Sequence, residues 1–154
     1  MLERFGADVQ IILTGISMGA STVLMAAGEK LPPNVIGVLA DCGYTSAKEM
    51  IQIVIYRMKL PVGLVYQFVK LGANLFGHFD LEEGPPIESV KKASVPVIFF
   101  HGDQDDFVPC EMSVRNFDAC SAKKKLVIIP GAGHGLSYPV SPEVYLEELG
   151  VFFS

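Results

Sequence analysis

Apolar residues gather in four short runs along the chain: Val9 to Leu13, Val35 to Ala40, Val95 to Phe100 and Leu126 to Ile129. The runs are rich in valine and isoleucine and are almost continuous, without alternating polar residues. Such runs are typical of strands buried on both faces, as in a parallel sheet that is covered by helices. We therefore expect a mostly parallel sheet of about four strands.

Helical patterns separate or follow these runs. Met18 to Ala27 is small and apolar and is followed by Gly28, while Pro109 to Cys120 begins with a proline, which suits a first helical turn. A third helix is expected from Pro142 onward, with an apolar stripe formed by Tyr145, Leu149, Phe152 and Phe153. Alternating strands and helices predict the α/β class, with a doubly wound sheet flanked by helices.

A long apolar segment from Met50 to Phe79 separates the second run from the third. Arg57, Lys59 and Lys70 interrupt it, which argues against a membrane helix, and Pro61 predicts a break between two short helices. The segment is interpreted either as helices that pack on the core or as an apolar cap over a substrate pocket. Its many aliphatic and aromatic residues favour the cap, inserted into a single domain that spans residues 1–154.

Composition excludes several classes of protein. The chain has 12 Lys+Arg against 17 Asp+Glu, for a net charge of −5, which argues against nucleic-acid binding. Half of its residues are hydrophobic and its mean hydropathy is +0.39, so intrinsic disorder is excluded. Met1 to Phe5 lacks the apolar region of a signal peptide, and the charge-free stretch from Val9 to Gly28 is best explained as strand, turn and helix. We expect a cytoplasmic protein without a membrane span.

The strongest chemical signal is Gly15-Ile16-Ser17-Met18-Gly19, placed directly between an expected strand and an expected helix. This is the G-x-S-x-G nucleophile elbow in its required context. Glycines are needed because side chains at Gly15 and Gly19 would collide with neighbouring backbone. The turn presents the Ser17 hydroxyl as a nucleophile and directs the Met18 N–H, a candidate oxyanion donor, at the same point.

A serine hydroxyl needs a base, and the base needs an orienting acid. The third run is followed by an acidic loop that contains Asp105, and the fourth run by a glycine-rich loop that contains His134. Ser, then Asp, then His is the chain order of the α/β-hydrolases.

From the elbow to its end, the chain resembles the catalytic half of an α/β-hydrolase, in particular the serine-aminopeptidase-like and monoacylglycerol-lipase-like esterases. The resemblance implies that Asp105, in H-G-x-x-D-x-x-V-P, is the triad acid and that His134, in G-x-G-H-G, is the triad base. Some family members place the acid after the preceding strand, where this chain has Asp41. Asp41 is therefore the alternative acid.

The other histidines and the cysteines have simpler interpretations. His101 is expected to brace the acid loop through its ring nitrogens, and His78 to be a cap or surface residue. Three cysteines without a C-x-x-C pair indicate reduced thiols that serve in packing: Cys42, Cys110 and Cys120. No motif implies a metal or an organic cofactor.

These features predict a serine hydrolase that cleaves carboxylic esters of short to medium acyl chains through an acyl-enzyme. A peptidase or a thioesterase on the same triad is a close variant. Members of the family usually carry further strands before the elbow, with a loop that supplies a second oxyanion donor. The loss of such a donor costs roughly 100- to 1,000-fold in kcat, so the alternative is an inert binding or assembly module.

The shortened sheet also leaves the strand from Val9 to Leu13 as a bare apolar edge, which is a template for pairing with another chain. We expect either a homodimer that covers this edge or a fragment of a longer hydrolase.

Overall fold

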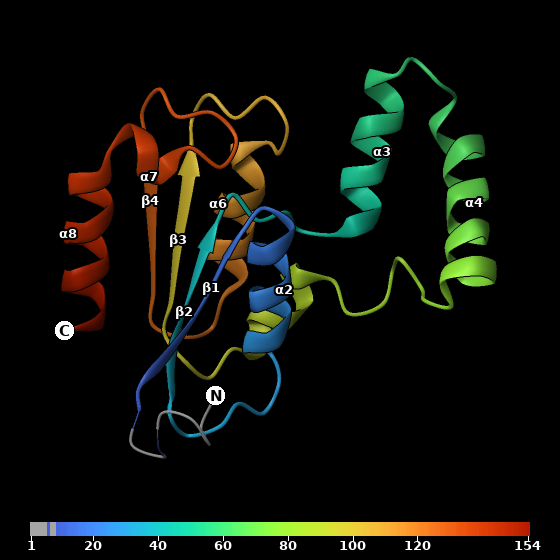
Figure 1. The fold of residues 1–154 in the computed structure, drawn as a ribbon. Coiled ribbons are helices and arrows are strands. Elements are labelled where there is room, and N and C mark those ends of the chain that lie inside the picture. Colours follow the sequence, from blue (N-terminus) through green and yellow to red (C-terminus); the bar gives the residue numbers. More distant parts are fainter. Residues whose placement is uncertain (1–5, 7–8) are drawn as a thin grey trace.

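The computed structural model describes residue 6 and residues 9–154, which form a sheet of four parallel strands flanked by helices (Figure 1). The strands lie in the order of the sequence and are β1 (Ile11–Ile16), β2 (Val35–Asp41), β3 (Val97–Gly102) and β4 (Lys124–Ile129). The predicted α/β class is confirmed. The first strand begins at Ile11 rather than Val9 and continues to the residue before Ser17.

Helices cover both faces of this sheet, as the doubly wound prediction requires. One face carries α2 (Met18–Ala27) and α6 (Cys110–Ala119), and the other carries α8 (Pro142–Phe153) (Figure 1). All three helices lie where the sequence pattern predicted them. The predicted stripe on α8 is confirmed, because its tyrosine, leucine and phenylalanines pack against the core.

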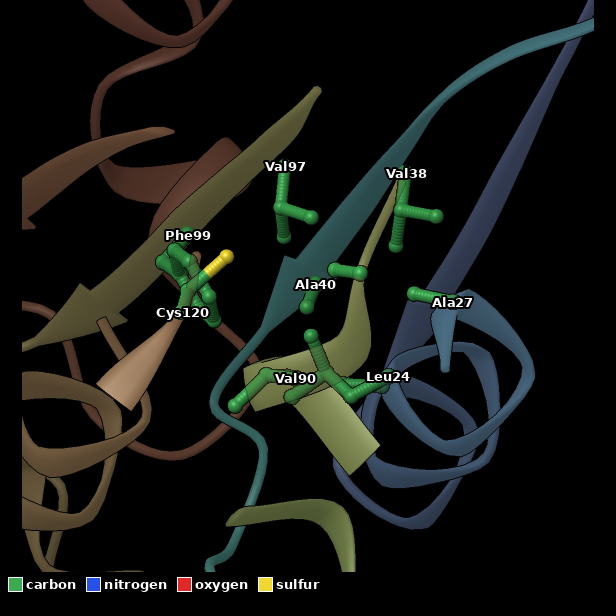
Figure 2. Packing of buried hydrophobic residues seen from close by; sticks show 10 residues of the cluster. Leu24, Ala27, Val38, Ala40, Val90, Val97, Phe99 and Cys120 are labelled. Carbon is green, nitrogen blue, oxygen red and sulfur yellow. The ribbon is translucent and has the colours of Figure 1, made fainter. Parts of the chain in front are cut away.

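Alternate residues of the central strands enter two separate cores. Val38, Ala40, Val97 and Phe99 point to the α2 face, where they meet Leu24 and Ala27 together with Val90 and Cys120 (Figure 2). Leu39, Ile98 and Phe100 point the other way and pack against Tyr145 and Phe152 of α8. Burial on both faces is the physical reason for the continuous apolar runs.

The long segment after β2 forms two helices, as predicted from Pro61. They are α3 (Ala47–Arg57) and α4 (Val62–Gly72), and they extend away from the sheet (Figure 1). Four short elements follow in the chain that the sequence pattern did not predict: η1 (Ala73–Gly77), α5 (Pro86–Ser89), η2 (Val90–Lys92) and α7 (Ser137–Val140).

Helix α3 is attached to the segment that carries Asp105. Met50 packs against Val108 and Met112, and Arg57 Nη1 donates a hydrogen bond of 3.1 Å to the carbonyl oxygen of Phe107. Further out, the insert is held by a polar cluster in which the Tyr66 hydroxyl, Lys48 and Lys70 all contact Glu82. These contacts fix the start of the insert beside the acid loop.

Strand β1 forms one edge of the sheet and pairs with β2 alone among the described residues. The expectation about Met1 to Phe5 concerns residues outside those that the structure describes. Over residue 6 and residues 9–154, no helix is long and apolar enough to cross a membrane.

Candidate active site

The chain makes the predicted sharp turn at Ser17, between β1 and α2. Ser17 has φ 56° and ψ −116°, a backbone conformation that is strained for a residue with a side chain. A Cβ on Gly15 would lie 2.2 Å from the carbonyl carbon of Gly19, so the glycine at position 15 is required. The same expectation for Gly19 is wrong, because a Cβ there would meet no described atom within 4 Å beyond its chain neighbours and the backbone of its own helix.

The backbone amides around the turn have different environments. The Ser17 N–H donates to the Asp41 carbonyl oxygen at 2.8 Å, which ties the turn to the end of β2. Met18 is the first residue of α2, and the first amides of a helix have no acceptor within it. The Met18 N–H is therefore the amide beside Ser17 that a substrate oxygen could use.

A hydrogen-bonded chain joins Ser17, His134 and Asp105. His134 Nε2 lies 2.9 Å from Ser17 Oγ, and His134 Nδ1 lies 2.8 Å from Asp105 Oδ2. The side chain of Asp105 is fully buried, whereas that of His134 is 27% exposed and can be reached from solvent. The first distance is within the range for proton transfer between a nucleophile and its base, and the second is that of a hydrogen bond that orients the histidine ring. The structure thus brings together three residues that motifs had placed at the ends of three different strands.

The Asp105 carboxylate is held by its own loop and by His101. Asp105 Oδ1 accepts the N–H groups of Phe107 and Val108, each at 2.9 Å, and Oδ2 lies 3.2 Å from Nε2 of His101. The His101 ring is fully buried, with Nδ1 2.7 Å from Ser113 Oγ and Nε2 3.0 Å from the Val108 carbonyl oxygen. The prediction that His101 braces the acid loop is confirmed.

Asp41, the alternative acid, is bonded elsewhere. Its Oδ1 accepts a hydrogen bond of 2.6 Å from the Ser137 hydroxyl, and burial raises its pKa while this bond opposes the increase. In the structure, Asp105 and not Asp41 contacts His134.

The loop that carries His134 is rich in glycine for a conformational reason. Gly131 and Gly135 have φ of 78° and 67°, in the left-handed region that side chains rarely adopt. The Gly131 N–H donates to Asp103 Oδ1 at 2.7 Å, and the ring of Phe107 lies edge-on to His134, with centroids 5.1 Å apart. Neither contact was predicted from the sequence. The only indication in the sequence was that Asp103 and Phe107 lie within the H-G-x-x-D-x-x-V-P motif that carries Asp105.

The cysteines agree with the prediction of free thiols. The Cys42 sulfur and ligand atoms of Asp105 and His134 lie within 4.8 Å of one another, a spacing that could hold a metal ion. Burial raises the pKa of Cys42 to about 12, which disfavours the thiolate that binds metals. Asp105 and His134 also bond to each other, so these groups fit the hydrogen-bonded chain better than a metal centre. That the protein needs no cofactor stays a prediction.

His78, the third histidine, is exposed and follows η1 in a left-handed conformation. Its predicted position as a cap at the surface is confirmed.

Apolar side chains near the three residues remain exposed. Ile16 and Met18 flank Ser17, Phe107 follows Asp105 and Leu136 follows His134; each side chain is about half exposed or more. In the insert, a cavity of about 390 Å³ between α3 and α4 has an entirely apolar lining that includes Met50, Val54 and Val65. The insert thus offers apolar surface, as its composition predicted.

The parallel sheet, the strained serine turn and the Ser17–His134–Asp105 chain define an α/β-hydrolase fold. Structural comparison agrees. A puromycin-hydrolyzing peptidase of Mycobacterium tuberculosis superposes with a TM-score of 0.71 at 19% identity, over 98% of this chain and 22% of that one. A monoacylglycerol lipase of Paleococcus ferrophilus gives a TM-score of 0.67 at 18% identity, over 94% of this chain and 68% of the lipase.

Within that class, the chain belongs to the prolyl oligopeptidase family, which it matches over residues 3–154. The Bacillus subtilis protein YqkD, described as uncharacterized, is 27% identical over 142 residues, which are 90% of this chain and 46% of YqkD. The chain spans less than half the length of the sequence relatives that it matches here. The predicted resemblance to α/β-hydrolases is confirmed.

Proposed function

We propose that this protein is a serine hydrolase that cleaves carboxylic esters through an acyl-enzyme. One observation carries the proposal: Ser17, His134 and Asp105 form a continuous hydrogen-bonded chain that ends on a strained, half-buried serine. A serine with this conformation and a histidine partner is the arrangement that acyl transfer requires.

The proposed reaction has two halves. Ser17 Oγ attacks the ester carbonyl while His134 Nε2 takes its proton, and Asp105 stabilises the imidazolium that forms. The oxyanion of the tetrahedral intermediate accepts a hydrogen bond from the Met18 N–H. When this intermediate collapses, the ester bond breaks and His134 returns the proton to the leaving alcohol. Water then attacks the acyl-enzyme by the same route and releases the acid. A second oxyanion donor must come from outside the residues assigned here.

Exposed apolar residues support an apolar acyl group. Ile16, Phe107 and Leu136 are exposed and lie within two residues of Ser17, Asp105 and His134 in sequence, and α3 packs beside the acid loop. We propose that residues 50–79 act as a cap whose apolar surface contacts short to medium acyl chains. The structural similarity to a monoacylglycerol lipase is consistent with an ester substrate.

A peptidase is the second candidate. The family match to prolyl oligopeptidases and the similarity to a puromycin-hydrolyzing peptidase favour amide substrates on the same three residues. A thioesterase would use the same chemistry.

The test compares esters with amides that release the same kind of chromophore. We expect the purified protein to hydrolyse p-nitrophenyl esters from acetate to laurate with a maximum at short to medium chains, and to act far more slowly on aminoacyl p-nitroanilides. A preference for the anilides would replace the esterase with the peptidase. Absence of turnover on both series, together with no labelling of Ser17 by a fluorophosphonate, would favour the inert binding module.

We further propose a homodimer in which the outer edge of β1 pairs with a second copy. β1 is an edge strand whose residues are only partly covered, and unpaired edges recruit other strands. Light scattering should then give twice the chain mass of 16.7 kDa. The N–H groups of Ile11 and Ser17 donate to β2, so the N–H of Thr14, at the alternate parity, faces the outer edge. Proline in place of Thr14 would therefore remove a backbone donor from this edge and weaken the assembly. A monodisperse monomer with a cooperative melt would contradict the dimer.

A further inference from the structure

Asp41 contacts both the Ser17 turn and the segment that follows the histidine loop. As the last residue of β2, it pairs with Ile16, and its carbonyl oxygen accepts the Ser17 N–H at 2.8 Å. On the other side of β2, the Cys42 N–H donates to the Phe100 carbonyl oxygen at 2.9 Å. The backbone of Asp41 is therefore fixed by the two strands that flank it.

The Asp41 side chain reaches to the segment that follows His134. It is 1% exposed, and Oδ1 accepts a 2.6 Å hydrogen bond from the hydroxyl of Ser137, which is itself fully buried. Ser137 is the first residue of α7, immediately beyond the glycine-rich loop. A short bond to a buried carboxylate is among the stronger hydrogen bonds in proteins.

The histidine loop contains glycines, which restrict its backbone less than other residues would, so contacts from outside the loop are needed to fix it. Left-handed glycines at positions 131 and 135 lie on either side of His134, and glycine restricts the chain least. The loop entrance is held by Asp103, which accepts the Gly131 N–H at 2.7 Å. Asp41 supplies the corresponding contact at the exit through Ser137.

This contact has an energetic cost. Asp41 Oδ2 is buried, and among the described residues no group makes a hydrogen bond of good geometry to it. Burial raises the pKa of Asp41, and the Ser137 and Tyr145 hydroxyls oppose the increase. A buried carboxyl oxygen without a well-formed hydrogen bond is destabilising, and the 2.6 Å bond from Ser137 offsets part of that cost.

We propose that Asp41 is a positioning residue that fixes the His134 loop through Ser137, and that it is not a second triad acid. The inference rests on the proposed function, in which His134 must lie within hydrogen-bond reach of Ser17. Loss of the Asp41–Ser137 bond would leave the triad residues intact but allow His134 to move relative to Ser17.

Three variants test this role by ester hydrolysis. Asp41→Ala and Ser137→Ala each remove one partner, and we expect kcat to fall about 100-fold with little change in KM, because a small displacement of the base has this effect. The double variant should be little worse than either single one, since both remove the same contact. Asp41→Asn keeps an oxygen acceptor for Ser137 and should lose only about fivefold, as a neutral hydrogen bond replaces a charged one.

Hydrogen exchange tests the same inference without activity. Amides of residues 131–140 should exchange faster in Asp41→Ala and Ser137→Ala than in wild type, while strand β3 stays protected. Ser21→Ala is the matched control, because it removes an equally buried hydroxyl whose partner is Tyr44, and it should leave this exchange unchanged.

The outcomes separate this inference from the proposed function. If wild type neither turns over esters nor reacts with a fluorophosphonate, the proposed function fails, and hydrogen exchange still decides whether Asp41 fixes the loop. Unchanged exchange over residues 131–140 in Ser137→Ala would overturn the inference. An Asp41→Asn variant as inactive as Asp41→Ala would also overturn it, and would make Asp41 an acid in the mechanism.

Discussion

Replacing Ser17 by alanine is expected to abolish ester hydrolysis and fluorophosphonate labelling while the protein stays folded. The hydroxyl is the atom that forms the acyl-enzyme, and no other group in the hydrogen-bonded chain can take its place. In a serine hydrolase with a complete site, removing the nucleophile lowers kcat by about a million-fold. A missing second oxyanion donor would lower the wild-type rate by about 100- to 1,000-fold, so the observed ratio would be correspondingly smaller.

The measurement uses p-nitrophenyl butyrate turnover and intact-mass detection of the phosphonate adduct, for wild type beside Ser17→Ala. Ser121→Ala is the control, because its hydroxyl bonds the Ala93 carbonyl oxygen away from the triad and its loss should change neither readout. Peptide mapping should place the adduct on Ser17. Undiminished labelling of Ser17→Ala would remove this residue from the mechanism.

The strands and the main helices could be predicted because each pattern has one dominant physical cause. Val97 to Phe100 is fully buried on both sides of the sheet, which leaves no polar residue to obscure the run. Met18–Ala27 was predicted to the residue, since the elbow sets its start and Gly28 follows its end. The short elements α5 and α7 could not be found in this way, because a single helical turn has no repeating pattern.

The three reacting residues were predictable because each follows a recognisable strand within a motif. The parallel strands then end at one edge of the sheet, so residues far apart in sequence meet there. Asp41 shows where this reasoning reached its limit. It too lies at the end of a strand, and only the three-dimensional structure shows that Ser137, rather than His134, contacts its carboxylate. Gly19 shows a different limit, since crowding depends on which segments lie nearby.

Asparagine in place of Asp105 is expected to lower kcat by about 10,000-fold, with the fold preserved. The side-chain oxygen of asparagine can still accept the N–H groups of Phe107 and Val108, so the acid loop should keep its conformation. The other position, now an amide, would donate toward His134 Nδ1 and would favour the histidine tautomer that carries its proton on Nε2. That tautomer cannot accept the proton of Ser17.

Comparing Asp105→Asn with Asp41→Asn decides which of the two carboxylates orients His134. Both carboxylates are buried and both lie at the carboxyl end of a strand, but only Asp105 contacts His134. We expect Asp105→Asn to retain the wild-type melting temperature within a few degrees while turnover collapses, and Asp41→Asn to retain most of its turnover. The ratio of the two kcat values, measured on one ester under one set of conditions, reports which acid orients the base. If Asp41→Asn were the more damaging change, the acid would be Asp41, and the hydrogen bond between Asp105 and His134 would serve only to hold the loop.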